Sequence, residues 1–118
     1  MFSLASLNGT YGYYRFGKNY GDAPDSDITS VGYITFDGKG KATSSQQTSR
    51  SGSYNPALPD FPPPIPLSYT VNSIGTFAVM DAAKNVISNG VILGGGNEFY
   101  SLSRTTTTGV IVVGKKMS

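Results

Sequence analysis

A run of β-branched and aromatic residues that turns at an Asp-Gly pair constrains the fold of this chain more than any other feature. The run extends from Val31 to Thr43, with Asp37 and Gly38 at its centre. Asp-Gly between two such arms is typical of a β-hairpin, because glycine adopts the positive φ that tight turns require. A second segment, from Tyr69 to Val79, repeats the pattern around turn residues 72–75. The chain is therefore predicted to fold as consecutive hairpins.

About eight short segments with strand character follow one another along the 118 residues. Short connections favour meander pairing, so we expect an all-β, antiparallel up-and-down β-barrel rather than a sandwich, which remains the alternative. Residues 1–118 are expected to form one domain with one core. The predicted strands are Thr10–Phe16, Ile28–Phe36, Lys41–Gln47, Ser68–Asn72, Thr76–Asp81, Val86–Leu93, Glu98–Arg104 and Thr107–Lys115.

Six prolines lie between Ser49 and Leu67, where they remove backbone donors and favour polyproline II. This Pro-rich segment is predicted to lie outside the sheet. Its apolar side chains, among them Leu58 and Phe61, indicate a loop that packs back on the barrel. A lid over the barrel mouth and a proline-rich ligand for another protein are the alternatives. Gly17 to Ser26 is predicted to be a second loop, and Gly94 to Asn97 a flexible turn.

The chain contains neither cysteine nor histidine. The lack of cysteine excludes disulfides, thiolate catalysis and Cys-ligated metal sites. The lack of histidine removes the commonest general base, and with it Ser-His-Asp hydrolysis. Asp22, Asp25 and Asp27 alternate like the carboxylates of a calcium loop, but the closing glutamate is missing, so we interpret them as a solvated loop. We expect no metal and no cofactor.

The charged residues do not point to a polyanionic partner. Nine basic and seven acidic side chains give a net charge of +2, and the basic ones are scattered. We therefore expect no nucleic-acid partner.

No apolar run approaches the roughly 18 residues of a membrane helix, so no membrane span is expected. Met1 to Leu7 is too short for a secretory signal. Strands that are apolar on both faces, such as Val110 to Val113, need a cover. The Pro-rich segment, the N-terminal residues Phe2 and Leu4, and a second copy in a homo-oligomer are the alternatives.

Tyrosines on predicted strands are the best candidates for a ligand site. Alternation places Tyr11, Tyr13 and Arg15 on one face of the first strand. Tyrosine suits a small-molecule pocket because it offers a flat apolar face and one hydroxyl, although ordinary core packing is the alternative. An inward Arg15 would need a carboxylate such as Glu98 or Asp37. The candidate ligand-binding residues are Tyr11, Tyr13, Arg15, Tyr33, Tyr69, Tyr100 and Arg104.

Glu98 is the only glutamate and the candidate catalytic residue. Strand alternation places it on one face with Tyr100, Leu102 and Arg104. If that face lines an apolar lumen, the pKa of Glu98 would be raised and the side chain could donate a proton. The alternative is a surface carboxylate that pairs with Arg104 or closes the Gly-rich turn.

Three motifs in order carry a resemblance to a known group of proteins. They are Gly9-Thr10-Tyr11, the hairpin Phe36-Asp37-Gly38-Lys39-Gly40, and Tyr69-Thr70-Val71-Asn72 followed by Gly75. This order resembles small bacterial, usually exported proteins with calycin-like or allene-oxide-cyclase-like barrels. It covers most of the chain outside the Pro-rich segment. The resemblance implies a barrel, export to the periplasm or the exterior, and frequent oligomerisation.

Three functions are compatible with these observations. The first, which we favour because catalytic groups are scarce, is a barrel that binds a small apolar or aromatic ligand. The second follows from the resemblance, since barrels of the allene oxide cyclase kind cyclise or isomerise apolar substrates by holding them in a folded shape. The third is a structural subunit that assembles through strand edges.

Overall fold

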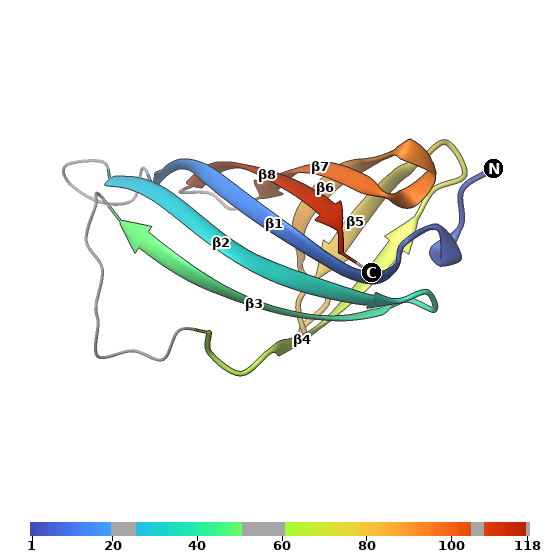
Figure 1. Cartoon of the computed structure of the whole chain (residues 1–118), viewed down its shortest axis with the longest axis horizontal. Helices are drawn as coiled ribbons and strands as arrows, with labels where there is room; N and C mark the ends of the chain where they lie inside the picture. Colours follow the sequence, from blue (N-terminus) through green and yellow to red (C-terminus); the bar gives the residue numbers. More distant parts are fainter. Residues whose placement is uncertain (20–25, 51–60, 105–107, 118) are drawn as a thin grey trace.

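A computed structural model describes residues 1–19, 26–50, 61–104 and 108–117, and every structural statement below concerns these residues. They form eight antiparallel strands, each paired with the next along the chain, and β8 pairs back to β1 (Figure 1). The predicted all-β, closed up-and-down barrel is confirmed. The strands are β1 (Asn8–Asn19), β2 (Ser26–Asp37), β3 (Lys41–Arg50), β4 (Ile65–Val71), β5 (Thr76–Met80), β6 (Val86–Leu93), β7 (Glu98–Arg104) and β8 (Thr108–Lys116).

The predicted hairpin turn at Asp37 is confirmed in detail. The Asp37 carboxylate accepts hydrogen bonds from the backbone N–H groups of Lys39 at 2.7 Å and Lys41 at 3.0 Å. These donors stabilise the charged form and lower the pKa of Asp37. Gly38 has a φ of 76°, which a residue with a side chain would seldom adopt. The Asp-Gly pair thus sets the register of β2 against β3.

The prediction of a loop from Gly17 to Ser26 is wrong at both ends, because β1 continues to Asn19 and β2 begins at Ser26. Gly17 belongs to the strand since its missing side chain lets β8 come close. A Cβ there would lie 2.7 Å from the Cα of Val110. Glycine in this strand therefore marks a close approach of two backbones. Asp22 and Asp25 lie outside the described residues.

The Pro-rich segment is also shorter than predicted. Ser49 and Arg50 extend β3, and Pro66 pairs with Thr43 near the start of β4, where a missing N–H is tolerated. The described residues before β4 pack back on the barrel, as expected of a cover. The centroids of the Phe61 and Tyr33 rings lie 5.9 Å apart. The Ser45 hydroxyl donates a hydrogen bond to the Pro62 carbonyl at 2.5 Å. Leu58 lies outside the described residues.

The N-terminal segment closes one end of the barrel. The short helix η1 (Leu4–Ser6) lies at the end where the β4–β5 turn is found (Figure 1). The Tyr69 hydroxyl donates a hydrogen bond that the carbonyls of Leu4 and Leu7 share, at 3.0 and 2.9 Å. Leu7 is fully buried, and the N–H of Phe2 donates to the carbonyl of Ser73. This end is therefore filled by protein.

Next to this N-terminal plug, which consists of residues 2–7, aromatic rings pack edge to face around Phe36 in the barrel interior. Its ring centroid lies 4.8 Å from Tyr69, 5.5 Å from Tyr11, 6.2 Å from Phe99 and 6.4 Å from Phe77, with interplanar angles of 78° to 88°. Edge-to-face rings interact favourably because the positive edge of one meets the negative face of another. All five rings are buried, and they form the centre of the core.

Glycines opposite these aromatic residues make room for the rings. Gly90 pairs with Phe77, and Gly114 pairs with Phe99. A Cβ on Gly90 would lie 2.6 Å from the Phe77 ring, and a Cβ on Gly114 would overlap the Phe99 ring. Each ring thus lies over the backbone of the neighbouring strand. The glycines are packing residues rather than turn residues.

Gly114→Ala is expected to lower the free energy of unfolding by about 1–3 kcal/mol, because the new methyl group displaces the Phe99 ring from the cluster. Urea denaturation measures the change. Gly12→Ala is the matched control, since its Cβ would meet only the flexible Met117 side chain, at 3.1 Å. Equal stability of the two variants would contradict the packing role of Gly114.

Candidate functional site

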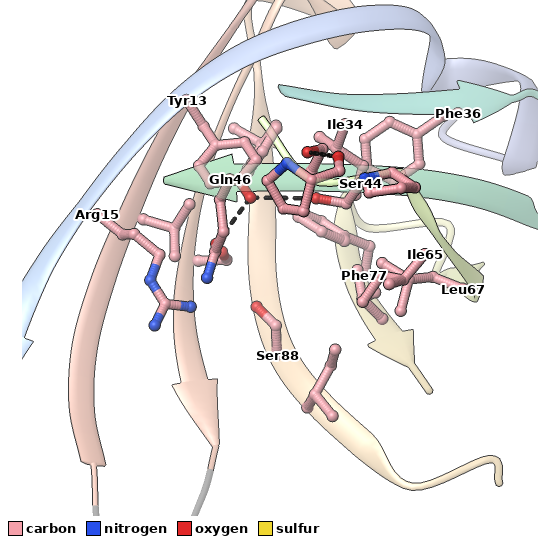
Figure 2. A pocket seen from close by; sticks show the side chains of 18 residues that line it. Tyr13, Arg15, Ile34, Phe36, Ser44, Gln46, Ile65, Leu67, Phe77 and Ser88 are labelled. Atoms are coloured by element: carbon pink, nitrogen blue, oxygen red, sulfur yellow. Dashed lines mark hydrogen bonds between the residues drawn. The ribbon is translucent and has the colours of Figure 1, made fainter. Parts of the chain in front are cut away.

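A cavity of about 290 Å³ lies directly above the aromatic core, inside the barrel (Figure 2). Its floor consists of the rings of Phe36, Phe77 and Phe99, with Val79 and Val112 beside them. The volume is at the small end of the range for small-molecule pockets. The remaining described lining residues are Tyr13, Arg15, Ile34, Ser44, Ser45, Gln46, Pro62, Pro63, Ile65, Leu67, Ile87, Ser88 and Ser101.

Unequal strand pairing leaves space at the edge of this cavity. β3 pairs with β4 only where residues 41–44 meet residues 65–68. Beyond Ser44, β3 continues along β2, whereas the chain before β4 turns away (Figure 1). Pro62 and Pro63 lie at this separation and form part of the cavity lining. Side chains from all eight strands line the cavity, and the proline pair borders it where β3 and β4 separate.

Tyr13 reaches across β2 to two side chains of β3. It pairs with Gly32, and Gly32 in turn pairs with Gln46, so the three residues form one row across three strands. A Cβ on Gly32 would lie 2.9 Å from Cζ of Tyr13, so only glycine leaves the ring this path. The Tyr13 hydroxyl donates to Oε1 of Gln46 at 2.9 Å and lies 3.1 Å from Oγ of Ser44. Figure 2 shows this contact at the cavity wall.

Burial keeps Tyr13 in its phenol form. Loss of solvation raises the pKa of its hydroxyl, and this outweighs the hydrogen bond to Ser44 and the positive charge of Arg15, which lower it. The Gln46 Nε2 makes one weak contact, 3.4 Å to the Thr48 hydroxyl. An amide nitrogen carries two N–H groups, so Gln46 can donate a further hydrogen bond. The wall thus presents hydrogen-bond donors next to apolar rings.

Arg15 lies one inward position beyond Tyr13 on β1. Its side chain is half-buried and lines the same cavity as Gln46 and Ser88 (Figure 2). Arg15 makes interactions of its own. Among the described lining residues it carries the only formal charge, and no carboxylate belongs to that set. The electrostatic character of the described lining is therefore positive.

The tyrosines proposed as ligand residues divide among three environments. Tyr13, like Arg15, lines the cavity. Tyr11 and Tyr69 face inward but lie in the solid core, where their hydroxyls donate to the carbonyls of Gly96 and of Leu4 and Leu7. Tyr33 faces outward and is covered by Phe61, and Tyr100 is exposed on the outer face. The interpretation of ordinary core packing thus describes Tyr11 and Tyr69.

The hypothesis that the face of Glu98 lines the lumen is wrong. On β7 the inward positions belong to Phe99 and Ser101, so Glu98 and Tyr100 point outward. Glu98 forms an ion pair with Lys115, with Oε1 and Nζ 3.4 Å apart. A surface carboxylate was the alternative, although Lys115 takes the place expected for Arg104, whose side chain lies outside the described residues. Asp37 is exposed at its turn, so neither predicted carboxylate partner of Arg15 faces the cavity.

The polar residues of the cavity wall are not among the predicted site residues. The second arm of the Asp37 hairpin is mostly polar, a composition typical of a strand that faces solvent, yet Ser44 and Gln46 point inward. The hairpin register indicates this orientation, because it pairs Ser44 with Ile34, whose side chain points inward. Ser88 and Ser101 gave no such signal, because inward serines resemble outward ones until strand pairing is known.

Comparison of the chain with protein-family models, with curated proteins and with solved structures finds no match. The barrel architecture is established by the closed strand pairing of the structure. Within the described ranges no group of three or more acidic, histidine or cysteine residues could hold a metal ion. None of the described helices has the length and hydropathy that crossing a membrane requires.

The buried phenols predict that stability falls at alkaline pH. Burial raises the pKa values of Tyr11, Tyr13 and Tyr69 above the ordinary value of 10.0. Below about pH 10 the phenols are protonated in both states, so the free energy of unfolding is unaffected. Above that pH the unfolded chain ionises first, and stability is lost until the folded-state pKa values are passed.

Urea denaturation between pH 8 and pH 11.5 measures this loss. Tyr69→Phe is expected to reduce the slope of the pH dependence, since it removes one of the three groups. A free energy of unfolding that stays constant up to pH 11.5 would contradict the prediction.

Proposed function

We propose that this barrel binds one small, mostly apolar molecule in the cavity above the aromatic core. The observation that carries the proposal is the change in the barrel interior from a solid aromatic cluster to a cavity of about 290 Å³. Apolar rings at the floor supply burial, and a few polar groups on the wall orient the ligand. Since one water takes about 30 Å³ of liquid volume, the cavity accommodates about ten non-hydrogen atoms.

Two further features support binding as the function. The walls are held by strand pairing on most sides, so the site is preformed and a ligand need not order it. The polar groups of the wall satisfy one another through Tyr13, Ser44 and Gln46, which keeps the empty site stable. The hairpin motifs add support for an exported, periplasmic or extracellular binding protein through their resemblance to barrels of that kind.

Ser88→Leu is expected to weaken binding of 1-octanol at least about tenfold, because the larger side chain fills the cavity into which Ser88 points (Figure 2). Isothermal titration calorimetry measures the dissociation constant. Thr43→Leu is the matched control, since it adds a similar group on the exposed outer face of β3 and should leave binding unchanged. Undetectable binding to the unmodified chain of 1-octanol and of its charged counterparts, octanoate and octylammonium, would overturn the proposal.

We also propose that the barrel associates with a second copy through the outer face of β1, β7 and β8. Phe16 pairs with Ile111 and Ile111 with Leu102, so these three outward side chains form a row across the strands. Tyr14 and Tyr100 flank the row, and all five are 44–52 % exposed. They expose roughly 450 Å², taking about 100 Å² for each half-exposed aromatic and about 70 Å² for each aliphatic side chain. Stable interfaces bury about 800 Å² per partner, of which this apolar face is a large part.

Ile111→Asp is expected to shift a dimer to a monomer, because it places a charge at the centre of this face. Sedimentation velocity at several protein concentrations measures the mass. Thr43→Asp adds the same charge on the exposed face of β3 and should leave the dimer intact. A monomer mass for the unmodified chain at all concentrations up to about 100 μM would contradict self-association.

A further inference from the structure

We propose that the ligand of the cavity is an amphiphile with a short apolar tail and a carboxylate head, and that the head binds at Arg15. This inference rests on the proposed binding function and specifies the chemical class of the ligand. It is carried by the order in which apolar and polar groups follow one another along the inner face of the barrel.

On β1, β3, β6 and β7 the inward side chains become more polar with distance from the plugged end. Along β1 the inward side chains run from buried Tyr11 to Tyr13 and then Arg15. Three of the other strands follow the same order in the same direction, whereas β2, β4, β5 and β8 contribute only apolar side chains to the described lining. Ala42 precedes Ser44 and Gln46 on β3, Phe99 precedes Ser101 on β7, and Ile92 lies deeper than Ser88 on β6. A ligand that matches this order has its apolar part on the rings and its polar part beside Arg15.

The donors at the polar end select an acceptor of hydrogen bonds. A guanidinium carries five N–H donors, and a carboxylate takes two of them in a fork. The other three donors remain for the interactions that Arg15 makes within the protein. Gln46 supplies a further N–H group on the same wall, next to the Tyr13 hydroxyl. The positive charge favours an anion over a neutral head of equal size and disfavours an ammonium head.

The cavity volume sets the length of the tail. At about 30 Å³ per non-hydrogen atom, a volume of about 290 Å³ corresponds to about ten atoms. Octanoate has this size. Its neutral and cationic counterparts, 1-octanol and octylammonium, have the same tail, so any difference in affinity among the three reports on the head alone.

Calorimetric titration of the unmodified chain at pH 7.5 with these three ligands is the first test. Octanoate is expected to bind at least about tenfold tighter than 1-octanol, because only its head forms a charge-assisted fork. Octylammonium is expected to bind more weakly than either. This comparison requires no variant, so it stands even if a substitution at Arg15 prevents folding.

Arg15→Gln is the second test, and it is expected to reduce octanoate affinity about tenfold, to the level of 1-octanol, while 1-octanol affinity changes less than about threefold. Lys18→Gln is the matched control, because it removes an equal charge on the same strand from an exposed residue that pairs with Asp27 at 3.5 Å. It should leave octanoate binding unchanged.

The outcomes separate this inference from the proposed function. If octanoate binds no tighter than 1-octanol, or if octylammonium binds tightest, the carboxylate assignment is overturned and the binding function stands. An octanoate preference that survives Arg15→Gln overturns the role of Arg15. If none of the three ligands binds, the inference and the proposed function fail together.

Discussion

The edge-to-face contacts of Phe36 with the surrounding rings are the interaction on which the rest of this barrel depends. They bring side chains from β1, β2, β4, β5 and β7 together at one point inside the closed sheet. Rings of this size fit because the neighbouring strand offers glycine at the opposite position, as Gly90 does for Phe77. Aromatic burial and backbone spacing are thus coupled, and neither residue type can change without the other.

A glycine also lies opposite an aromatic ring one inward position nearer the open end of the barrel, but there the result is different. Gly32 lets the Tyr13 ring cross β2, but there the partners are Ser44 and Gln46 rather than another ring. The Tyr13 hydroxyl makes hydrogen bonds at the wall, and no further ring fills the interior at this level. The cavity therefore starts here. One packing rule therefore accounts both for the solid part of the barrel and for the wall of its site.

The two faces of the sheet carry apolar groups for different reasons. Inside, rings are held by the cluster and by the N-terminal plug, which Tyr69 fastens through the carbonyls of Leu4 and Leu7. Outside, Phe16, Leu102 and Ile111 remain about half exposed on adjacent strands. The excess of apolar strand residues seen in the sequence is thus concentrated on one outer face, which is the face we assign to a second copy.

The sequence by itself determined the architecture of this protein, because hairpin turns are local: Asp37-Gly38 and the turn at 72–75 specify pairing between neighbours, and a series of such pairs can close only with its own first strand. It also indicated the inward row of Tyr11, Tyr13 and Arg15, since alternation along one strand is local too. Only the tertiary structure decided which of these residues meets a cavity. That choice depends on partners far apart in the chain, namely the rings that fill the space around Tyr11, the glycine that frees Tyr13, and the separation of β3 from β4 that opens the wall. The outward position of Glu98 was decided in the same way, because a strand alone has two equivalent faces and only closure of the barrel distinguishes inside from outside.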